Sequence, residues 1–384
     1  MISFELSEEQ KQLRDLARDF AKKEIIPKAA EYDETAKFPK DILEKAFEVG
    51  LLNLCVPSKF GGGELSNIET VIVTEELGYG CTGVATSMMV NDLALTPIVL
   101  FGSDELKEKF LKVFTKKYTT GSFCLTEPDA GSDVAGLQTR ATKQGDYYVL
   151  NGVKNFITNG SYAELFTVFA SLDPSKRHES MCCFAVEKQP GITVSKKENK
   201  MGQRASDTVQ VVFNNVKVLA TQRIGKDGEG WLVAMKTLDK SRPLVAAAAI
   251  GVARRAMECA LDYSKERSAF GKTIGEYQAI QFMLADMAKA VEASRLLCWK
   301  AAWLLDQKKP STHISSMAKC FSTDTAVKAS IDAVQIYGGY GYMKDYPVEK
   351  LMRDSKLLQI YEGTNQIQRI VIARELLRNY SFFY

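Results

Sequence analysis

The hydrophobic period of this chain changes twice, and that change limits the possible folds more than any single motif does. Residues 1–120 carry apolar side chains at helical spacing, residues 121–230 shift toward an alternation of two, and residues 231–384 return to helical spacing. A chain of 384 residues also exceeds one ordinary hydrophobic core. We therefore expect three domains with these boundaries, in the order helical, β and helical.

Local signals support the two helical regions. Ser7 and Gln10 form a capping-box pattern at the start of the first expected helix. In the C-terminal region, apolar or small residues recur at alternating spacings of four and three, which favours a four-helix bundle of nearly antiparallel helices. The residues of this seam are Ile280, Leu284, Met287, Val291, Ser294, Cys298, Ala301 and Leu305.

The middle region consists of short β-prone segments that do not alternate with helices. This pattern favours an antiparallel β-barrel or sandwich over a parallel doubly wound sheet, so the fold class is α+β and multidomain. The dipeptide Asn151-Gly152 between two such segments predicts a two-residue hairpin. Further strands are expected at Cys182–Val186, Ile192–Val194 and Val209–Phe213.

Composition excludes several classes of protein. The 50 basic and 47 acidic residues leave a net charge of only +3, which argues against a nucleic-acid-binding protein. The eight cysteines show no C-x-x-C pair, so we expect free thiols in a reducing compartment and no metal site. The N-terminus lacks a signal-peptide pattern, and no run of about 18 apolar residues occurs. We expect a cytoplasmic protein without a membrane span.

Carboxylates are the leading candidates for acid–base chemistry because the chain has only two histidines, and His178 lies in a charged run. Glu362 stands between the apolar run Leu358–Tyr361 and a Gly363-Thr364 helix start. A carboxylate with apolar neighbours has a raised pKa and can accept a proton near neutral pH. Spacing alone favours an ordinary glutamate on a turn before a helix over a catalytic base.

Two glycine-containing segments call for opposite interpretations. Gly78–Gly83 matches the dinucleotide pattern G-x-G-x-x-G, but the residues before it read as the end of an amphipathic helix rather than a strand, so we do not expect a nucleotide site there. In the loop Thr126–Asp133, Gly131 and Ser132 permit close backbone approach and offer N–H and hydroxyl donors to a ligand. An ordinary turn would have a similar composition.

Six segments together resemble the acyl-CoA dehydrogenase family, in order and at family spacing, over essentially the whole chain. The chain departs from the family at two positions. Many relatives have Trp at the position of Phe156, a conservative change that keeps an aromatic face, whereas many have a hydroxyl residue at that of Ala269, where this chain lacks that polar contact. The segments are Thr-Glu-Pro-x-Ala-Gly-Ser-Asp at 126–133, Lys-Asn-Phe-Ile-Thr-Asn-Gly at 154–160, Asp-Lys-Ser-Arg-Pro at 239–243, Arg-Ser-Ala-Phe-Gly-Lys at 267–272, Gln-Ile-Tyr-Gly-Gly at 335–339, and Ile-Tyr-Glu-Gly-Thr-x-Gln-Ile-Gln at 360–368.

The resemblance implies an FAD cofactor and a homotetramer, because in the family the segment containing Arg267 reaches the flavin of a neighbouring subunit. The implied FAD contacts are Phe123, Leu125, Thr126, Gly131, Ser132, Phe156, Thr158, Arg267, Phe270, Gln278, Gln335, Gly339, Thr364 and Gln366. The implied substrate contacts are Ser132, Met235, Asp239, Arg242, Tyr361 and Gly363.

The implied reaction is α,β-dehydrogenation of a short- or medium-chain acyl-CoA to the 2-enoyl-CoA. Glu362 would remove the α-proton while the β-hydrogen leaves as hydride to flavin N5, and an electron-transferring flavoprotein would reoxidise the flavin. Some family members carry the catalytic carboxylate at the position of Ser241, and its absence there leaves Glu362 as the base. A flavin oxidase of the same fold is the alternative enzyme class.

Asp92 is the one unexpected residue in the segment that resembles the floor of the family's acyl pocket. Relatives usually have an uncharged residue here. Because a lone buried carboxylate is costly, Asp92 could be a paired or capping residue that faces away from the pocket. The alternative is that it lines the cavity, which would suit an alicyclic acyl-CoA.

Overall fold

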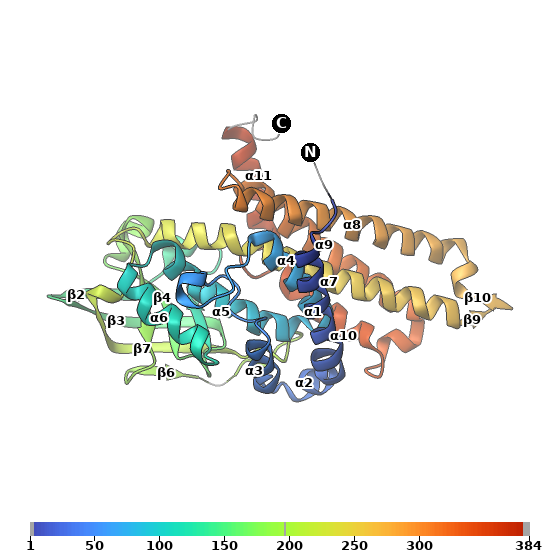
Figure 1. Ribbon diagram of the computed structural model, residues 1–384, viewed down its shortest axis with the longest axis horizontal. Coiled ribbons are helices and arrows are strands. Elements are labelled where there is room, and N and C mark those ends of the chain that lie inside the picture. Colours follow the sequence, from blue (N-terminus) through green and yellow to red (C-terminus); the bar gives the residue numbers. More distant parts are fainter. Residues whose placement is uncertain (1–3, 196, 379–384) are drawn as a thin grey trace.

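The computed structural model describes residues 4–195 and 197–378, and it has the expected order of a helical, a β and a helical domain (Figure 1). The capping box of Ser7 and Gln10 is formed at the start of the first helix. The main helices of the N-terminal domain are α1 (Glu8–Phe20), α2 (Ala29–Thr35), α3 (Lys40–Glu48), α4 (Asn67–Gly80), α5 (Thr82–Phe101) and α6 (Asp104–Lys116).

The middle domain is one eight-stranded sheet with the order β6-β7-β3-β2-β4-β5-β8, and β1 pairs with β4. Most pairs are antiparallel, but β1 runs parallel to β4. The strands are β1 (Gly121–Cys124), β2 (Arg140–Gln144), β3 (Tyr147–Thr158), β4 (Leu165–Ser171), β5 (Met181–Glu187), β6 (Ile192–Val194), β7 (Thr208–Leu219) and β8 (Arg223–Ile224).

The predicted hairpin at Asn151-Gly152 is wrong. Strand β3 runs straight through this dipeptide, and its register against β7 shifts between Leu150 and Gly152. A Cβ at Gly152 would lie 2.6 Å from Thr139 Cα, so the glycine permits a close backbone approach rather than a chain reversal. The reversal comes earlier, between β2 and β3, where Gly145 has a φ of +57°.

Three long helices form the body of the C-terminal domain, and the predicted seam residues from Met287 to Ala301 are buried along the second of them. In Figure 1 the sheet lies at one end of the molecule and the turn between the first two long helices at the other. The elements are α7 (Gly230–Glu266), β9 (Ser268–Ala269), β10 (Lys272–Thr273), α8 (Gln278–Asp306), α9 (Thr312–Tyr337), α10 (Pro347–Leu358) and α11 (Asn365–Arg378).

The glycines of the G-x-G-x-x-G match serve helix packing. Gly78 lies in α4, and a Cβ there would come within 2.7 Å of Ala248 Cα in α7. The adjoining Glu76 is 2% exposed and accepts hydrogen bonds from Arg254 of α7. The segment therefore joins the two helical domains and does not form a phosphate-binding loop.

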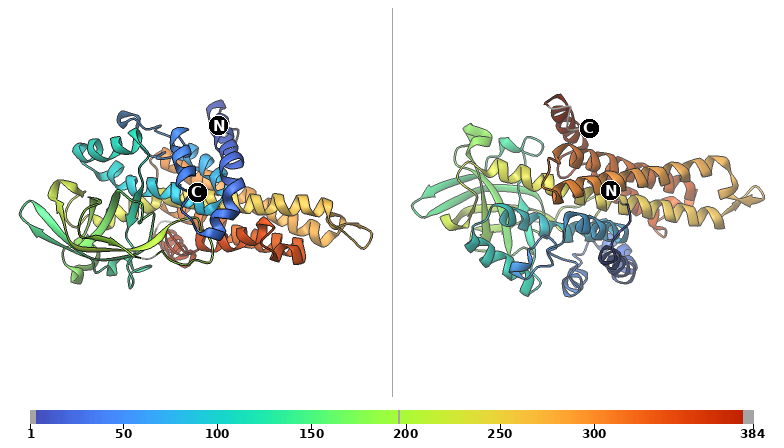
Figure 2. Two further views of the ribbon diagram at one scale, coloured as in Figure 1. Left: turned by 90° about the horizontal axis from the view of Figure 1, so that it is seen from below. Right: turned by 45° about the horizontal axis from the view of Figure 1, so that its top comes forward.

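Helix α5 is the one helix in the described part of the chain that is long and apolar enough to cross a membrane. However, 78% of its most apolar window is buried inside the protein. Its apolar composition is thus accounted for by packing, since the helix lies between the other elements of the N-terminal domain and the sheet (Figure 2).

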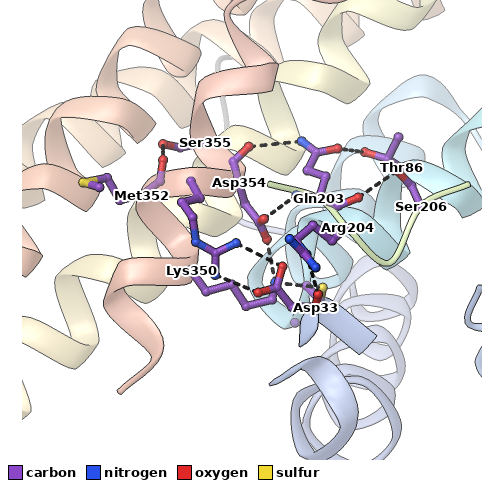
Figure 3. A network of polar contacts seen from close by, with 12 residues as sticks. Asp33, Thr86, Gln203, Arg204, Ser206, Lys350, Met352, Asp354 and Ser355 are labelled. Atoms are coloured by element: carbon purple, nitrogen blue, oxygen red, sulfur yellow. Dashed lines mark hydrogen bonds and ion pairs between the residues drawn. The ribbon is translucent and has the colours of Figure 1, made fainter. Parts of the chain in front are cut away.

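A polar network joins all three domains (Figure 3). Gln203, in the loop before β7, donates its backbone N–H to Asp354 of α10 at 2.5 Å and accepts from Thr86 of α5 at 2.8 Å. Asp33 of α2 pairs with Arg353 of α10 at 2.7 Å. These buried contacts fix the relative positions of the elements that surround the main cavity.

Candidate active site

The main cavity has a volume of about 800 Å³ and lies where the three domains meet. One wall is helix α5, with Met89, Val90 and Leu93. The other walls come from the end of β1 and the loop after it, from the end of β3, from α7, and from the segment that joins α10 to α11. The turn that contains Glu362 is part of this last wall.

Glu362 occupies a strained turn that is held by buried side chains. Its φ is +52° and that of Gly363 is +90°, both in the left-handed region that favours glycine. Gln368 donates from Nε2 to the carbonyl oxygens of Glu362 at 3.1 Å and Gly363 at 3.0 Å. A Cβ at Gly363 would lie 2.6 Å from Gln368 Nε2, so a side chain there would displace this support.

The Glu362 carboxylate has a raised proton affinity. Burial raises its pKa, and a hydrogen bond from Ser241 Oγ and the positive charges of Lys319 and Arg242 partly offset this effect. The carboxylate lines the cavity and can therefore reach a ligand inside it. A cavity-facing carboxylate with a raised pKa suits a general base.

Helix α7 supplies the predicted substrate-binding residues Met235, Asp239 and Arg242 to the same cavity. Arg242 is 4% exposed and donates to Asp239 Oδ1 at 2.8 Å, while its Nε has no partner among the described residues. The predicted residues Ser132, Tyr361 and Gly363 also line the cavity. A buried guanidinium N–H without a protein acceptor is free to bind an acceptor on a ligand.

Seven of the predicted FAD contacts lie together on the cavity wall: Phe123, Leu125, Thr126, Gly131, Ser132, Phe156 and Thr158. These residues belong to the end of β1 with the loop after it and to the end of β3. A buried ion pair joins the two segments, with Lys154 Nζ and Glu127 Oε1 2.7 Å apart. Asn155 N–H also donates to Thr126 O at 2.8 Å. These contacts give the loop a fixed shape.

The chemistry of this wall fits a flavin. The hydroxyls of Thr126, Ser132 and Thr158 make no hydrogen bond within residues 4–195 and 197–378, so they are available to a polar ligand. Phe156 has a φ of +57° and its side chain is 61% exposed, which leaves an aromatic face open for stacking. Nothing lies within 4 Å of a Cβ built at Gly131, so the backbone there is open to close approach.

The remaining predicted FAD contacts lie elsewhere. Arg267 and Gly339 line a second cavity of about 480 Å³ near the β9–β10 turn, at the opposite end of the molecule from the sheet (Figure 1). Phe270 in this turn is 98% exposed, and Gln278 and Gln335 are also exposed. Within one chain, the structure does not bring these residues to the main cavity.

The last two predicted FAD contacts, Thr364 and Gln366, lie at the start of α11. Thr364 accepts a hydrogen bond from Ile367 N–H at 3.3 Å and so caps the helix that follows the base turn. Gln366 is exposed, and neither residue is part of the lining of the main cavity in the described chain.

Asp92 is paired and does not line the main cavity, as expected for a buried carboxylate, and the alternative that it lines the acyl pocket is wrong. Its Oδ1 accepts a hydrogen bond from Cys55 N–H at 2.8 Å, whereas the next residue, Leu93, lines the cavity. Burial raises the pKa of the Asp92 carboxyl, and hydrogen bonds from the loop at Leu54 and Cys55 oppose this rise. The hydrogen bond to Cys55 N–H thus compensates the burial of the Asp92 carboxylate.

Several residues of the site could not be found by motif. Lys319, Trp231 and Lys236 belong to no recognised segment, although Lys319 supports the base turn and the other two line the cavity. Ser241 and Gln368 lie in recognised segments, but the sequence does not indicate their hydrogen bonds to Glu362. The described residues contain no group of three or more His, Cys, Asp or Glu side chains that could hold a metal ion.

Comparison with known proteins agrees with this geometry. Residues 7–117, 122–216 and 228–377 match the families described as acyl-CoA dehydrogenase N-terminal, middle and C-terminal domains. The chain is 45% identical over 375 residues to cyclohex-1-ene-1-carbonyl-CoA dehydrogenase of Geobacter metallireducens, covering 97% of this chain and 99% of that protein.

Two solved structures are similar over nearly the full length. The butyryl-CoA dehydrogenase of Megasphaera elsdenii is 41% identical with a TM-score of 0.96, covering 98% of this chain and 100% of that chain. A chain in a structure described as the electron-transferring flavoprotein of Acidaminococcus fermentans is 43% identical with a TM-score of 0.96 and the same coverage. The chain therefore belongs to the acyl-CoA dehydrogenase family and is a three-domain enzyme of acyl-CoA dehydrogenation from an FAD-dependent family.

Proposed function

We propose that this enzyme converts a short- or medium-chain acyl-CoA to its 2-enoyl-CoA, with Glu362 as the base. The observation that carries the proposal is the position of Glu362, a carboxylate of raised pKa on the wall of a cavity that also contains the flavin-type loop. The α-proton of the thioester would pass to Glu362 as the Cα–Cβ double bond forms. Bound FAD would supply the two-electron chemistry by accepting the β-hydrogen as hydride.

The residues around Glu362 would prepare the α-carbon for proton loss. The backbone N–H of Glu362 donates to no acceptor within the described residues and is available to the thioester oxygen, where negative charge develops. The apolar side chains of α5 exclude water from the acyl end and maintain the high proton affinity of the carboxylate. Phe156 and the hydroxyls of Thr126 and Thr158 would hold the cofactor.

We further propose that the functional unit is a homotetramer and that an electron-transferring flavoprotein reoxidises the cofactor in the cytoplasm. The separation of Arg267 and Phe270 from the main cavity supports a site completed by a second copy. The similarity to a chain in an electron-transferring-flavoprotein structure supports the electron acceptor.

A second candidate substrate is an alicyclic acyl-CoA. The relative from Geobacter metallireducens, whose name specifies such a substrate, favours it. Asp92 is a buried carboxylate of raised pKa next to the cavity-lining Leu93, although its Oδ1 is bonded to Cys55 N–H. Because Asp92 does not line the cavity, support for this candidate comes from the relative and not from a contact between Asp92 and the substrate.

Anaerobic bleaching of the flavin spectrum with a panel of thioesters tests the proposal. We expect fast bleaching by butyryl-CoA or hexanoyl-CoA and slow bleaching by long-chain acyl-CoA. Faster bleaching by cyclohex-1-ene-1-carbonyl-CoA than by any linear thioester would favour the second candidate. Rapid oxygen consumption by the substrate-reduced enzyme would instead indicate an oxidase, and a flavin unchanged by every acyl-CoA would contradict the proposed reaction.

A further inference from the structure

Lys319 is a buried cation behind the base turn. It lies in α9 and its side chain is 0% exposed. Nζ donates to the carbonyl oxygen of Gly363 at 2.8 Å and to Asn365 Oδ1 at 2.9 Å. Both acceptors are neutral, and Lys319 has no carboxylate within ion-pair distance among residues 4–195 and 197–378. A buried ammonium of this kind is costly unless a nearby negative charge compensates it.

The groups that face Lys319 identify the compensating charge. They are Glu362, Asp324 and the Cys320 thiol, with Arg242 opposing them. Asp324 is already engaged by Arg369 at 2.8 Å and by Asn365 Nδ2 at 2.7 Å. Glu362 has the largest stabilising effect on the charged lysine. The Lys319 pKa is lowered to about 8 by burial, so the ammonium is still mostly protonated at neutral pH.

The same pairing can be seen from Glu362. The groups that favour its ionised form are Ser241, through a hydrogen bond, and the charges of Lys319 and Arg242. Arg242 shares its charge with Asp239, whose Oδ1 lies 2.8 Å from Nη1. Lys319 has no such partner in the described chain, so more of its field acts on the base.

Lys319 also supports the shape of the turn. A glutamate in the left-handed region is strained and persists only where its surroundings hold it. The carbonyl of Gly363, directly after the base, accepts from both Lys319 Nζ and Gln368 Nε2. Loss of the lysine leaves this carbonyl with one donor instead of two.

We propose that Lys319 is a positioning residue for the base: it fixes the Glu362–Gly363 turn and supplies the positive charge that keeps the Glu362 carboxylate ionised. The inference rests on the proposed function, because it assumes that Glu362 removes the α-proton. Lys319 acts through the turn and does not contact the substrate.

Three variants separate the two contributions of the lysine. Lys319→Met removes the charge and the donor, whereas Lys319→Gln removes the charge and keeps an N–H donor. Lys328→Met is the matched control: it removes a lysine from the same helix, but this side chain is 70% exposed and pairs with Asp332. Bound FAD, measured from the visible spectrum, shows which purified variants are folded, and Lys319→Gln serves as the test if Lys319→Met is not.

The readout is α-proton exchange in D₂O with ethylthioacetyl-CoA, followed by mass spectrometry. Sulfur replaces the β-methylene in this thioester, so no β-hydride can leave and the flavin is not reduced. The base removes the α-proton and returns a deuteron, and no oxidant is consumed. The pH dependence of the exchange rate therefore reports the proton affinity of the base separately from the redox step.

Removing the positive charge should raise the pKa of Glu362, and the acidic limb of the exchange profile should move to higher pH. We expect a shift of roughly one pH unit in Lys319→Met and Lys319→Gln, equivalent to about a tenfold loss of rate below the limb. At the high-pH plateau, Lys319→Gln should exchange faster than Lys319→Met because it keeps the donor to Gly363. Lys328→Met should match the wild type.

An acidic limb at the wild-type pH in both FAD-bound Lys319 variants would overturn the inference, as would an equal shift in Lys328→Met. The proposed function fails separately: if Glu362→Gln exchanges the α-proton as fast as the wild type, the base has been misassigned whatever the Lys319 variants do.

Discussion

The regions around Glu362 and Asp92 contain two carboxylates that the sequence alone singled out, and they differ in what surrounds them. Burial raises the pKa of both groups. Glu362 lies on a turn at the cavity wall and accepts from Ser241, whereas Asp92 lies within α5 and accepts from Cys55 N–H, away from the cavity. A raised proton affinity is thus not sufficient to identify a base. Access to the ligand cavity distinguishes the two regions.

The largest expected effect comes from replacing Glu362 with glutamine, which keeps the shape and removes the proton acceptor. Turnover of butyryl-CoA with an artificial electron acceptor should fall by about 10³-fold or more, since general base catalysis contributes on this scale. The variant should retain FAD because the flavin-type loop is unchanged. Near-normal turnover with bound FAD would show that Glu362, like Asp92, is not required as the base.

Ser241→Ala should have an intermediate effect. The Ser241 hydroxyl donates to the ionised carboxylate and therefore lowers the pKa of Glu362. Without it the pKa rises, so the acidic limb of kcat/KM should move to higher pH by somewhat less than about one unit. A pH–rate profile of kcat/KM checks this, and a shift to lower pH would mean that the hydrogen bond favours the protonated acid.

The smallest effect is expected for Asp92→Asn. Asparagine keeps an oxygen acceptor for Cys55 N–H, so turnover of butyryl-CoA should change by less than about threefold. Parallel assays with cyclohex-1-ene-1-carbonyl-CoA sharpen the comparison. A loss confined to the alicyclic thioester would assign Asp92 a role in that reaction, and a large loss with both thioesters would place Asp92 in the catalytic machinery.

The sequence predicted the fold well where the signals were local. The order of the domains and the capping box at Ser7 follow from short-range patterns. The hairpin at Asn151-Gly152 was wrong because the same dipeptide can serve as an irregularity within a long strand. β-prone residues flank the dipeptide in a hairpin and also within one long strand, so the alternation of side chains does not distinguish a turn from an irregularity.

The site was predictable only where its residues are contiguous. The flavin-type loop and the base turn are short segments, and seven of the predicted FAD contacts share the cavity with Glu362. Ser241 lies 121 residues from Glu362, and Lys319 lies 44 and 46 residues from Gly363 and Asn365. No local pattern in the sequence indicates these contacts. The sequence also could not predict which way the Asp92 side chain points. Helix α5 is buried on nearly all sides, so its sequence has no separate polar face.

The central claim is that the dehydrogenation depends on a carboxylate at the position of the Glu362 side chain, where it can remove the α-proton of the bound thioester. Because Ser241 Oγ lies within hydrogen-bond distance of the Glu362 carboxylate, a carboxylate placed on α7 should reach the same region. The most direct measurement is single-turnover flavin bleaching by butyryl-CoA in Glu362→Gly and in the double variant Ser241→Glu, Glu362→Gly. We predict that the single variant is not bleached on the wild-type timescale and that the double variant recovers at least about tenfold. Wild-type bleaching by the single variant, or no recovery in an FAD-bound double variant, would contradict this account.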